Sequence, residues 1–369
     1  NYALAESTSF TEGSSSSQNT IKNRTTWTAI EAAGATHPYE QMGVHKVQSF
    51  SKDGTFLTGV GETIHIADFY CDVNHDIYDN KTITNLDDGG SGGSTFDSAT
   101  ASNNHCHVVA MFAAGDVSAR SGVAPDADLV LSSIRKYEGG NEGDDYASDL
   151  DAAKAAGAIV SNQSWGYNSG GSSYNLTELE SYISSNSLTN AQGLAVLMHG
   201  SSSGQDLTDA NTFVTALNNF ESTGVMVWSA ANDVGESDAS AMAGLPELFP
   251  DLGEAWIVAN VVQYTGDSDL SNATSSEFTL KGNKCGSTAE YCLSVDGYDV
   301  YAATYLDSGT SQYNNSRISY GSSWSAPMVS GGVALVAQAF PNHTPEQLVD
   351  RILASANNVW FTPEGNTTF

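Results

Sequence analysis

An aspartate, a histidine and a serine stand at positions where together they could activate a nucleophile: Asp68, His105 and Ser323. A serine hydroxyl needs a base that takes its proton, and the base needs a carboxylate that fixes its tautomer and stabilises its charged form. The order aspartate, histidine, serine along the chain is one of the known orders of such a triad. The three residues therefore predict attack of a serine on a carbonyl group.

The segment around Ser323 is the most informative of the three. Residues 321–327 have the sequence GSSWSAP, and small and apolar residues follow them up to residue 340. This pattern predicts a loop that leads into a buried helix, with Ser323 at the helix start. The free N–H groups and partial positive charge of a helix N-terminus stabilise the oxyanion that forms when a serine attacks a carbonyl.

Asp68 and His105 each have a simpler interpretation when they are taken alone. Asp68 closes the apolar run 64–67, where an aspartate can cap a turn or a helix. His105 precedes the small and apolar residues 108–115, where it fits as a polar residue in a first helical turn. The catalytic interpretation depends on their combination with Ser323.

A second serine motif competes with this hypothesis. Residues 200–204, GSSSG, match the G-x-S-x-G nucleophile elbow of α/β-hydrolases. Such an enzyme needs an acid and then a histidine further along the chain, but only His343 follows, directly before a helix cap at Thr344. We therefore interpret residues 200–204 as a low-complexity loop.

Composition and charge limit the class of protein. The chain has 369 residues, of which 40% are hydrophobic, and this is enough for a substantial core. Its 43 acidic and 13 basic residues give a net charge of −30, which opposes binding to nucleic acid and to anionic membranes. No apolar run is long enough to span a bilayer, and the first residues do not resemble a signal peptide, so we expect a mature or trimmed fragment.

The four cysteines allow up to two disulfide bonds. Their spacing contains no C-x-x-C pair, which disfavours a zinc site. Cys285 and Cys292 would close a short loop, and an extracellular setting favours that bridge. A bond between Cys71 and Cys106 is as consistent with the sequence as two free thiols.

Apolar runs and helical segments alternate along the chain. Strands are predicted at residues 63–67, 129–134, 158–161, 225–228 and 257–262. Helices are predicted at residues 108–114, 146–156, 207–222 and 344–357, the last with a capping box of Thr344 and Gln347. This order predicts an α/β fold, a doubly wound and mainly parallel sheet with helices on both faces, in which chemistry gathers at the carboxyl ends of the strands.

The division of the chain follows from composition. Residues 1–36 are rich in Ser and Thr and are expected to form an N-terminal arm, and residues 37–369 are expected to form a single catalytic domain. The glycine-rich residues 87–94 are expected to be a flexible loop.

Three segments match motifs of a known enzyme family. Residues 105–115, HCHVVAMFAAG, align without gaps to H-G-T-x-V-A-x-x-x-A-G, and residues 122–129, GVAPDADL, match G-V-A-P-x-A-x-L. Residues 321–327 match G-T-S-x-[AS]-x-P, with Ser322 in place of threonine. The chain thus resembles the subtilisin-like serine proteases over about residues 37–357. The resemblance implies that Ser323 is the nucleophile, His105 the base and Asp68 the carboxylate.

The match departs from the family pattern beside two of these residues. Aromatic residues follow Asp68 where the family has small ones, and Cys106 and His107 replace the glycine and threonine after the histidine. His107 could serve as the base only after a shift that breaks the later matches of the same motif, so the alignment favours His105.

Two further segments match parts of the family's substrate cleft. Residues 225–232 resemble V-V-x-A-A-G-N, which implies that Asn232 donates to the oxyanion and that Ala230 and Ala231 line the cleft beside it. Residues 161–166 resemble N-x-S-[LW]-G, a strand that pairs with the substrate backbone. By this match Ser164, Trp165 and Gly166 bind substrate.

A finer resemblance is to the subtilases that bacterial autotransporters carry as passengers. It rests on residues 245–250, 256–259, 285–286 and 291–293. This finer resemblance strengthens the expected Cys285–Cys292 bond and implies an exported enzyme, released or held at the cell surface. The metal ligands are unknown: structural calcium, which the family often binds, stays open because no segment has an ordered ligand spacing.

The resemblance as a whole implies a serine endopeptidase that acts on peptides or proteins and needs no organic cofactor. We expect the chain to be a monomer. Two alternatives stay open. The fold could serve as a catalytically impaired surface module, or the activity could be restricted to self-processing or to one partner.

Overall fold

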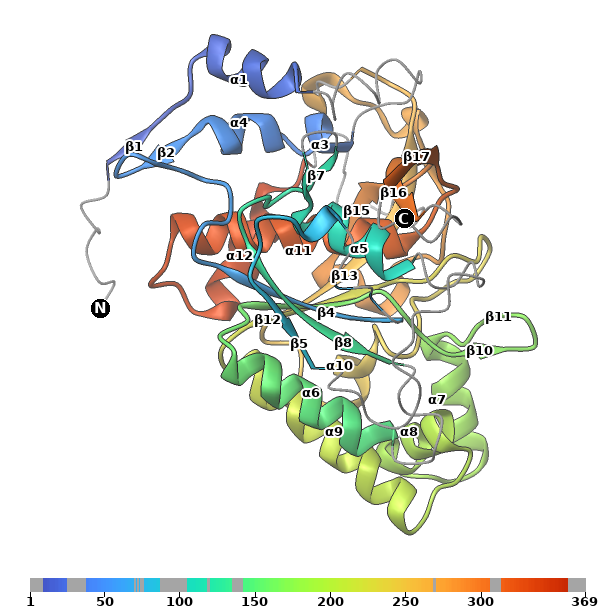
Figure 1. Cartoon of the computed structure of the whole chain (residues 1–369). Coiled ribbons are helices and arrows are strands. Elements are labelled where there is room, and N and C mark those ends of the chain that lie inside the picture. Colours follow the sequence, from blue (N-terminus) through green and yellow to red (C-terminus); the bar gives the residue numbers. More distant parts are fainter. Residues whose placement is uncertain are drawn as a thin grey trace, which may run out of the picture.

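A mainly parallel sheet forms the centre of the computed structural model of this protein (Figure 1). The structure describes residues 9–24, 38–69, 71, 73, 76–86, 105–117, 120–134, 142–267, 270–305 and 313–357. The strand order is β14-β13-β12-β9-β4-β8-β5, with β15 also paired to β13, and only β14 runs antiparallel to its neighbour.

The strands of this sheet are β4 (Thr63–Asp68), β5 (Ile83–Asn85), β8 (Asp128–Ser133), β9 (Val160–Gln163), β12 (Val225–Ser229), β13 (Trp256–Tyr264), β14 (Phe278–Leu280) and β15 (Cys292–Asp296). Short strands outside it are β1 (Phe10–Thr11), β2 (Ser51–Lys52), β3 (Thr55–Phe56), β6 (Asp116–Val117), β7 (Arg120–Ser121), β10 (Asn168–Ser169), β11 (Ser172–Ser173), β16 (Tyr301–Tyr305) and β17 (Tyr313–Arg317).

The helices are α1 (Ser15–Lys22), α3 (Pro38–Gln41), α4 (Val44–Ser49), α5 (His105–Ala114), α6 (Glu142–Ala155), α7 (Leu176–Ser185), α8 (Asn190–His199), α9 (Gln205–Glu221), α10 (Leu245–Leu248), α11 (Ser322–Ala339) and α12 (Pro345–Ser355). Short 3-10 helices cover Asp76–Tyr78, Leu270–Asn272, Ser275–Glu277 and Gly286–Tyr291.

Helices cover both faces of the sheet, as the doubly wound prediction requires (Figure 1). Helices α5, α11 and α12 pack on one face, against side chains such as Ile64 and Ile66 of β4. Helices α6, α8 and α9 pack on the other face, where the rings of Trp228 and Trp256 stack 5.7 Å apart. Because both faces are buried, strands such as β12 and β13 are nearly continuous apolar runs instead of alternating ones.

The predicted α/β fold is confirmed. The five predicted strands correspond to β4, β8, β9, β12 and β13, and the four predicted helices to α5, α6, α9 and α12. Thr344 and Gln347 form the expected capping box of α12. Boundaries differ most at α6, which begins at Glu142, four residues before the prediction, because no apolar periodicity marks its first turn.

The N-terminal residues that the structure describes contact the rest of the protein. β1 pairs with β2, and Ile21 of α1 is buried in the core on the α5 side of the sheet. The division into an arm of residues 1–36 and a catalytic domain of residues 37–369 stays a prediction. The expected flexible loop at residues 87–94 lies outside the described residues.

The competing elbow motif at residues 200–204 connects α8 to α9. A nucleophile elbow is a turn between a strand and a helix, whereas here a helix precedes the serines. Gly200 ends that helix in the left-handed conformation, with φ +80°. The segment is therefore a linker between helices.

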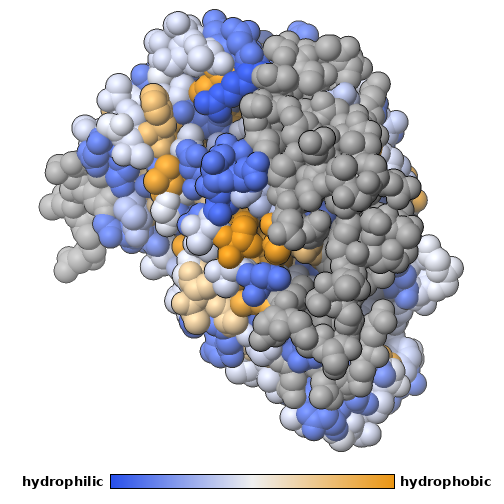
Figure 2. Space-filling model, in the orientation of Figure 1, coloured by the Kyte–Doolittle hydropathy of each residue, from blue (hydrophilic) through white to orange (hydrophobic). Residues whose placement is uncertain are grey.

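Figure 2 shows one face of the molecule. Where its residues are described, this face is mostly hydrophilic or near neutral, and apolar side chains gather in a few small areas. Among the described residues, no helix combines the length and the apolar character that crossing a membrane requires.

Candidate active site

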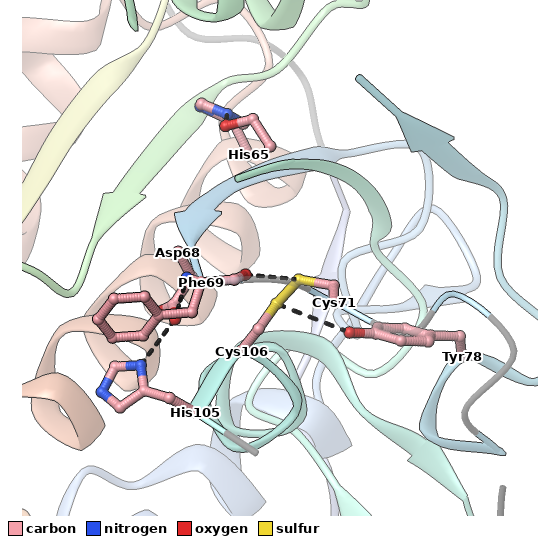
Figure 3. Close-up of a disulfide and its surroundings, with 8 residues drawn as sticks. His65, Asp68, Phe69, Cys71, Tyr78, His105 and Cys106 are labelled. Atoms are coloured by element: carbon pink, nitrogen blue, oxygen red, sulfur yellow. Dashed lines mark hydrogen bonds and ion pairs between the residues drawn. A yellow bond between two sulfur atoms is a disulfide. The ribbon is translucent and has the colours of Figure 1, made fainter. Parts of the chain in front are cut away.

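Asp68 and His105 meet at the carboxyl end of β4. Asp68 is the last residue of β4, and His105 is the first residue of α5, which packs on that strand. His105 Nδ1 lies 2.7 Å from Asp68 Oδ1, with the histidine side chain 21% exposed and the aspartate 1% exposed (Figure 3). The backbone N–H of Phe69 donates to the same oxygen at 2.7 Å. The carboxylate therefore orients the imidazole and leaves its Nε2 for another partner.

Aromatic rings enclose the imidazole of His105. Its ring centre lies 5.5 Å from that of Phe69 and 5.0 Å from that of Trp324. Phe69 is one of the aromatic residues that depart from the family pattern after Asp68, and Trp324 directly follows Ser323. The contact between Trp324 and His105 brings the start of α11 beside the start of α5.

A disulfide bond joins the segments that carry the aspartate and the histidine. Cys71 and Cys106 are bonded, with their Cα atoms 5.4 Å apart (Figure 3). Cys71 lies three residues after Asp68, and Cys106 directly follows His105. The second bridge, Cys285–Cys292, closes the seven-residue spacing in front of β15. The structure contains both of the pairings that the sequence suggested.

Two other histidines near the site have different surroundings. His107 is fully buried, and its ring centre lies 6.1 Å from that of Tyr78. His65 lies on β4 but on the opposite face from Asp68, since strand side chains alternate (Figure 3). Its nitrogens bond the hydroxyls of Ser132 and Ser161 at 2.9 and 2.8 Å. Of these histidines, it is His105 that the structure brings to Asp68.

Ser323 lies in the first turn of α11, as the sequence predicts. Its hydroxyl donates to the carbonyl oxygen of Ser164 at 3.3 Å, and the Ser164 hydroxyl donates to the carbonyl oxygen of Ser323 at 3.2 Å. The serine is thus joined to the end of β9, the segment that the sequence assigned to the substrate.

Asn232 follows β12 and is joined to the same end of α11. Its Oδ1 accepts from the backbone N–H and the hydroxyl of Ser322, at 2.7 and 3.0 Å. A backbone N–H can only donate, so the atom facing it must be the carbonyl oxygen. The Asn232 side chain is exposed, and its NH₂ group is the end left for a ligand. The sequence identified Ser322 only as a replacement for threonine, because its bonds to residue 232 are not a local pattern.

The proposed substrate strand is only in part open to a ligand. Gly166 is exposed, while Ser164 and Trp165 are buried. The Trp165 ring packs between those of Tyr146 and Trp228, with centres at 5.1 and 5.2 Å. Its side chain thus belongs to the core on the α6 side of the sheet, and the backbone of this segment is what a substrate can pair with.

Ala230 and Ala231 connect β12 to Asn232. Ala230 is buried, and its N–H donates to Ala259 of β13 at 3.0 Å. Ala231 is partly exposed and has a backbone φ of +92°, a conformation that residues other than glycine rarely adopt. Such strain persists where surrounding contacts enforce it, often at functional sites.

Within the part of the chain that the structure describes, no group of three or more His, Cys, Asp or Glu side chains is arranged to hold a metal ion. The question of structural calcium, which the sequence left open, is not decided by this finding.

Comparison with known proteins identifies the family. The model of the subtilase family matches residues 58–368. Over 150 residues, the chain is 29% identical to an extracellular serine protease of Serratia marcescens, a match that covers 37% of this chain and 13% of that relative. The chain therefore spans only a small part of the length of this relative.

Solved structures share the fold at low sequence identity. The protease domain of PatA matches with a TM-score of 0.56 and 19% identity, over 85% of this chain and 92% of that one. Fervidolysin from Fervidobacterium pennivorans, described as a keratinolytic enzyme related to subtilisin, gives 0.52 and 19%, over 82% and 40%. Sphericase gives 0.51 and 19%, over 84% and 87%. Because the family model covers most of the sequence, the chain belongs to the subtilase family of serine endopeptidases, which need no cofactor for catalysis.

Proposed function

We propose that this chain is a secreted or cell-surface endopeptidase in which Ser323 is the nucleophile, His105 the general base and Asp68 the carboxylate that orients it. The observation that carries the proposal is the 2.7 Å hydrogen bond between His105 Nδ1 and the buried Asp68 carboxylate. It makes Nε2 the basic atom of the imidazole and compensates the charge that the ring acquires.

The reaction begins when the Ser323 hydroxyl turns from the carbonyl of Ser164 to His105 Nε2. Ser323 Oγ then attacks the scissile carbonyl carbon while Nε2 takes the proton. The resulting oxyanion accepts hydrogen bonds from the Asn232 NH₂ group and from the Ser323 N–H at the start of α11. His105 gives the proton to the leaving amine as the C–N bond breaks, which leaves the acyl group on Ser323 Oγ. Water then attacks the acyl carbon while Nε2 takes a proton from it, and His105 returns that proton to Ser323 Oγ as the acyl C–O bond breaks.

Secretion and the autotransporter-passenger type are part of the proposal. The Serratia marcescens relative is described as extracellular. Two disulfides, Cys71–Cys106 and Cys285–Cys292, suit an oxidising compartment. The substrates would be peptides or proteins, bound along the backbone of residues 164–166 and beside Ala230 and Ala231.

A fluorophosphonate probe, which phosphonylates activated serines, tests the nucleophile. We expect the intact protein to react and Ser323→Ala to be inert. Two matched controls, Ser325→Ala in the same helical turn and Ser202→Ala in the linker between α8 and α9, should react like the wild type.

Other outcomes lead to different conclusions. An unreactive but folded wild type would support the catalytically impaired surface module, which the aromatic and cysteine substitutions beside Asp68 and His105 motivate. Loss of labelling in Ser202→Ala alone would transfer the nucleophile to residues 200–204. A labelled protein that leaves unfolded casein uncut would support a protease restricted to itself or to one partner.

A further inference from the structure

Asn283 lies behind the loop that carries the oxyanion donor. We infer that it is a positioning residue that holds residues 231–233, called here the oxyanion loop, in the geometry that catalysis needs. The inference rests on the proposed role of Asn232. Asn283 is 0% exposed and lies between β14 and β15, so it acts from within the protein and does not touch substrate.

Asn283 bonds the residues on both sides of Asn232. Its backbone N–H donates to the carbonyl oxygen of Ala231 at 3.2 Å. Its Oδ1 accepts from the backbone N–H of Asp233 at 2.9 Å. One residue therefore constrains the backbone immediately before and immediately after the donor. Ala231 needs such support, because its φ of +92° is unfavourable for alanine.

The rest of the Asn283 carboxamide is also engaged. Its Nδ2 donates to the carbonyl oxygen of Asp238 at 2.9 Å, and its Oδ1 also accepts from the Ser173 hydroxyl at 3.2 Å. Since the Asp233 N–H can only donate and the Asp238 carbonyl can only accept, the carboxamide has a single orientation. Ser173 belongs to the β10-β11 hairpin, and its own N–H donates to the Asp233 carboxylate at 2.6 Å.

The segment that carries Asn283 is itself anchored. A Cβ at Gly282 would lie 2.3 Å from the carbonyl oxygen of Ala231, so only glycine permits this close approach. Two residues after Asn283, the Cys285–Cys292 disulfide closes the following turn onto β15. The residue that holds the oxyanion loop therefore belongs to a segment that a disulfide bond closes.

This arrangement predicts an effect on the chemical step. An oxyanion donor stabilises charge that develops in the transition state, so its contribution depends on exact placement in advance of the reaction. A displacement of about 1 Å can cost about a hundredfold in rate. Binding of the ground-state substrate depends much less on this donor, so kcat should fall more than KM rises.

The test is a double-mutant cycle between Asn283 and Asn232, with kcat and KM measured on a peptide substrate. We expect Asn232→Ala to lower kcat by about 10²–10³, and Asn283→Ala by about 10–100-fold with KM changed by less than about threefold. In the Asn232→Ala background, Asn283→Ala should lower kcat by less than about threefold, because the donor that it positions is gone.

Two variants separate positioning from folding. Asn283→Asp keeps the acceptor for Asp233 and Ser173 but sets a carboxylate oxygen against the Asp238 carbonyl, so it should also lower kcat. Asn260→Ala removes another fully buried asparagine, whose Nδ2 lies 3.5 Å from Cys285 Sγ, and should leave kcat within about threefold of the wild type. Thermal unfolding shows which variants are folded at the assay temperature.

The outcomes distinguish the inference from the function on which it rests. If Asn232→Ala leaves kcat unchanged, the proposed oxyanion donor is wrong. If Asn232→Ala lowers kcat while Asn283→Ala and Asn283→Asp do not, only the positioning role is overturned. Equal losses from Asn283→Ala in both backgrounds would also overturn it, since the residue would then act independently of Asn232.

Discussion

Ser322 makes several hydrogen bonds at the proposed oxyanion site. Its hydroxyl donates to Asn232 Oδ1 at 3.0 Å and accepts from the backbone N–H of Ala231 at 3.0 Å. Its own N–H donates to the same Asn232 oxygen at 2.7 Å. The hydroxyl thus connects the first turn of α11 to the turn after β12, while the donor-only N–H of Ser322 fixes the orientation of the Asn232 carboxamide.

Removing this hydroxyl should slow catalysis without preventing folding. We expect Ser322→Ala to lower kcat by about two- to tenfold, which corresponds to the loss of about 0.5–1.5 kcal/mol of hydrogen bonding, since the backbone N–H bond to Asn232 remains. Ser322→Thr, which keeps the hydroxyl, should stay near the wild-type kcat. Steady-state kinetics on a peptide substrate measures both, and equal losses in the two variants would contradict the hydrogen-bonding role.

At the scale of elements, the relation between β4 and α5 determines whether Asp68 can reach His105. Helix α5 begins at His105, and the next residue is covalently tied to the segment after β4 through the Cys71–Cys106 disulfide. This bond stands where the family pattern has a glycine after the histidine. It constrains the first turn of the helix against the strand end.

Loss of this bridge should reduce both stability and turnover. In the chain-entropy model, a loop with a sequence separation of 35 corresponds to about 3–4 kcal/mol, so Cys71→Ala with Cys106→Ala should lower the free energy of unfolding by about 2–4 kcal/mol. Chemical denaturation measures this change.

The same double variant should have a lower kcat at a temperature where it is fully folded, because His105 loses part of its constraint. The double variant with Cys71→Ser and Cys106→Ser is measured beside it. It also lacks the covalent bond, but its side chains are closer in size to cysteine. A kcat equal to that of the wild type in both variants would show that packing alone positions the histidine.

At the scale of the whole molecule, a net charge of −30 coexists with carboxyl groups inside the fold. Burial raises the pKa of Glu221 to about 7, although the N–H groups of Ala255 and Gly253 counteract the shift. Glu221 ends α9, and its Oε1 accepts from Gly253 and Ala255 at 3.0 and 2.9 Å. It thus holds the turn that leads into β13.

The raised pKa makes the stability of the fold depend on pH. In the unfolded chain the pKa of Glu221 is near 4.5, the ordinary value of a glutamate, so the folded state binds the proton more tightly. The contribution of this group to stability is complete below pH 4.5 and is lost as the pH rises through about 7. We therefore expect the unfolding temperature to fall between mildly acidic and mildly alkaline pH, in part because of this residue.

Glu221→Gln tests this contribution. The amide oxygen can accept both backbone bonds that Oε1 accepts, and it carries no charge. We expect the variant to be more stable than the wild type at pH 8–9 by on the order of 1–3 kcal/mol, with the difference vanishing below pH 4.5. Asp251→Asn removes an exposed charge from the same turn and should leave the pH profile almost unchanged. Parallel profiles for Glu221→Gln and the wild type would refute the assignment.

The sequence by itself determined the fold class, the positions of the central strands and the family. Apolar runs such as those of β4 and β12 reveal buried strands because burial on both faces demands continuous hydrophobicity. The motifs around His105 and Ser323 can be recognised in the sequence because each is a contiguous segment at the start of one helix. The same local patterns also separated Ser323 from the serines of residues 200–204.

Only the tertiary structure decided which distant residues meet. The bonds of Ser322 to Asn232, the pairing of Cys71 with Cys106 and the contacts of Asn283 around residues 231–233 join segments that are far apart in the sequence. Hydrophobic periodicity reports whether a side chain is buried, but not which neighbour it finds there. That choice depends on strand order and helix packing, because a hydrogen bond requires its two atoms to lie within about 3 Å.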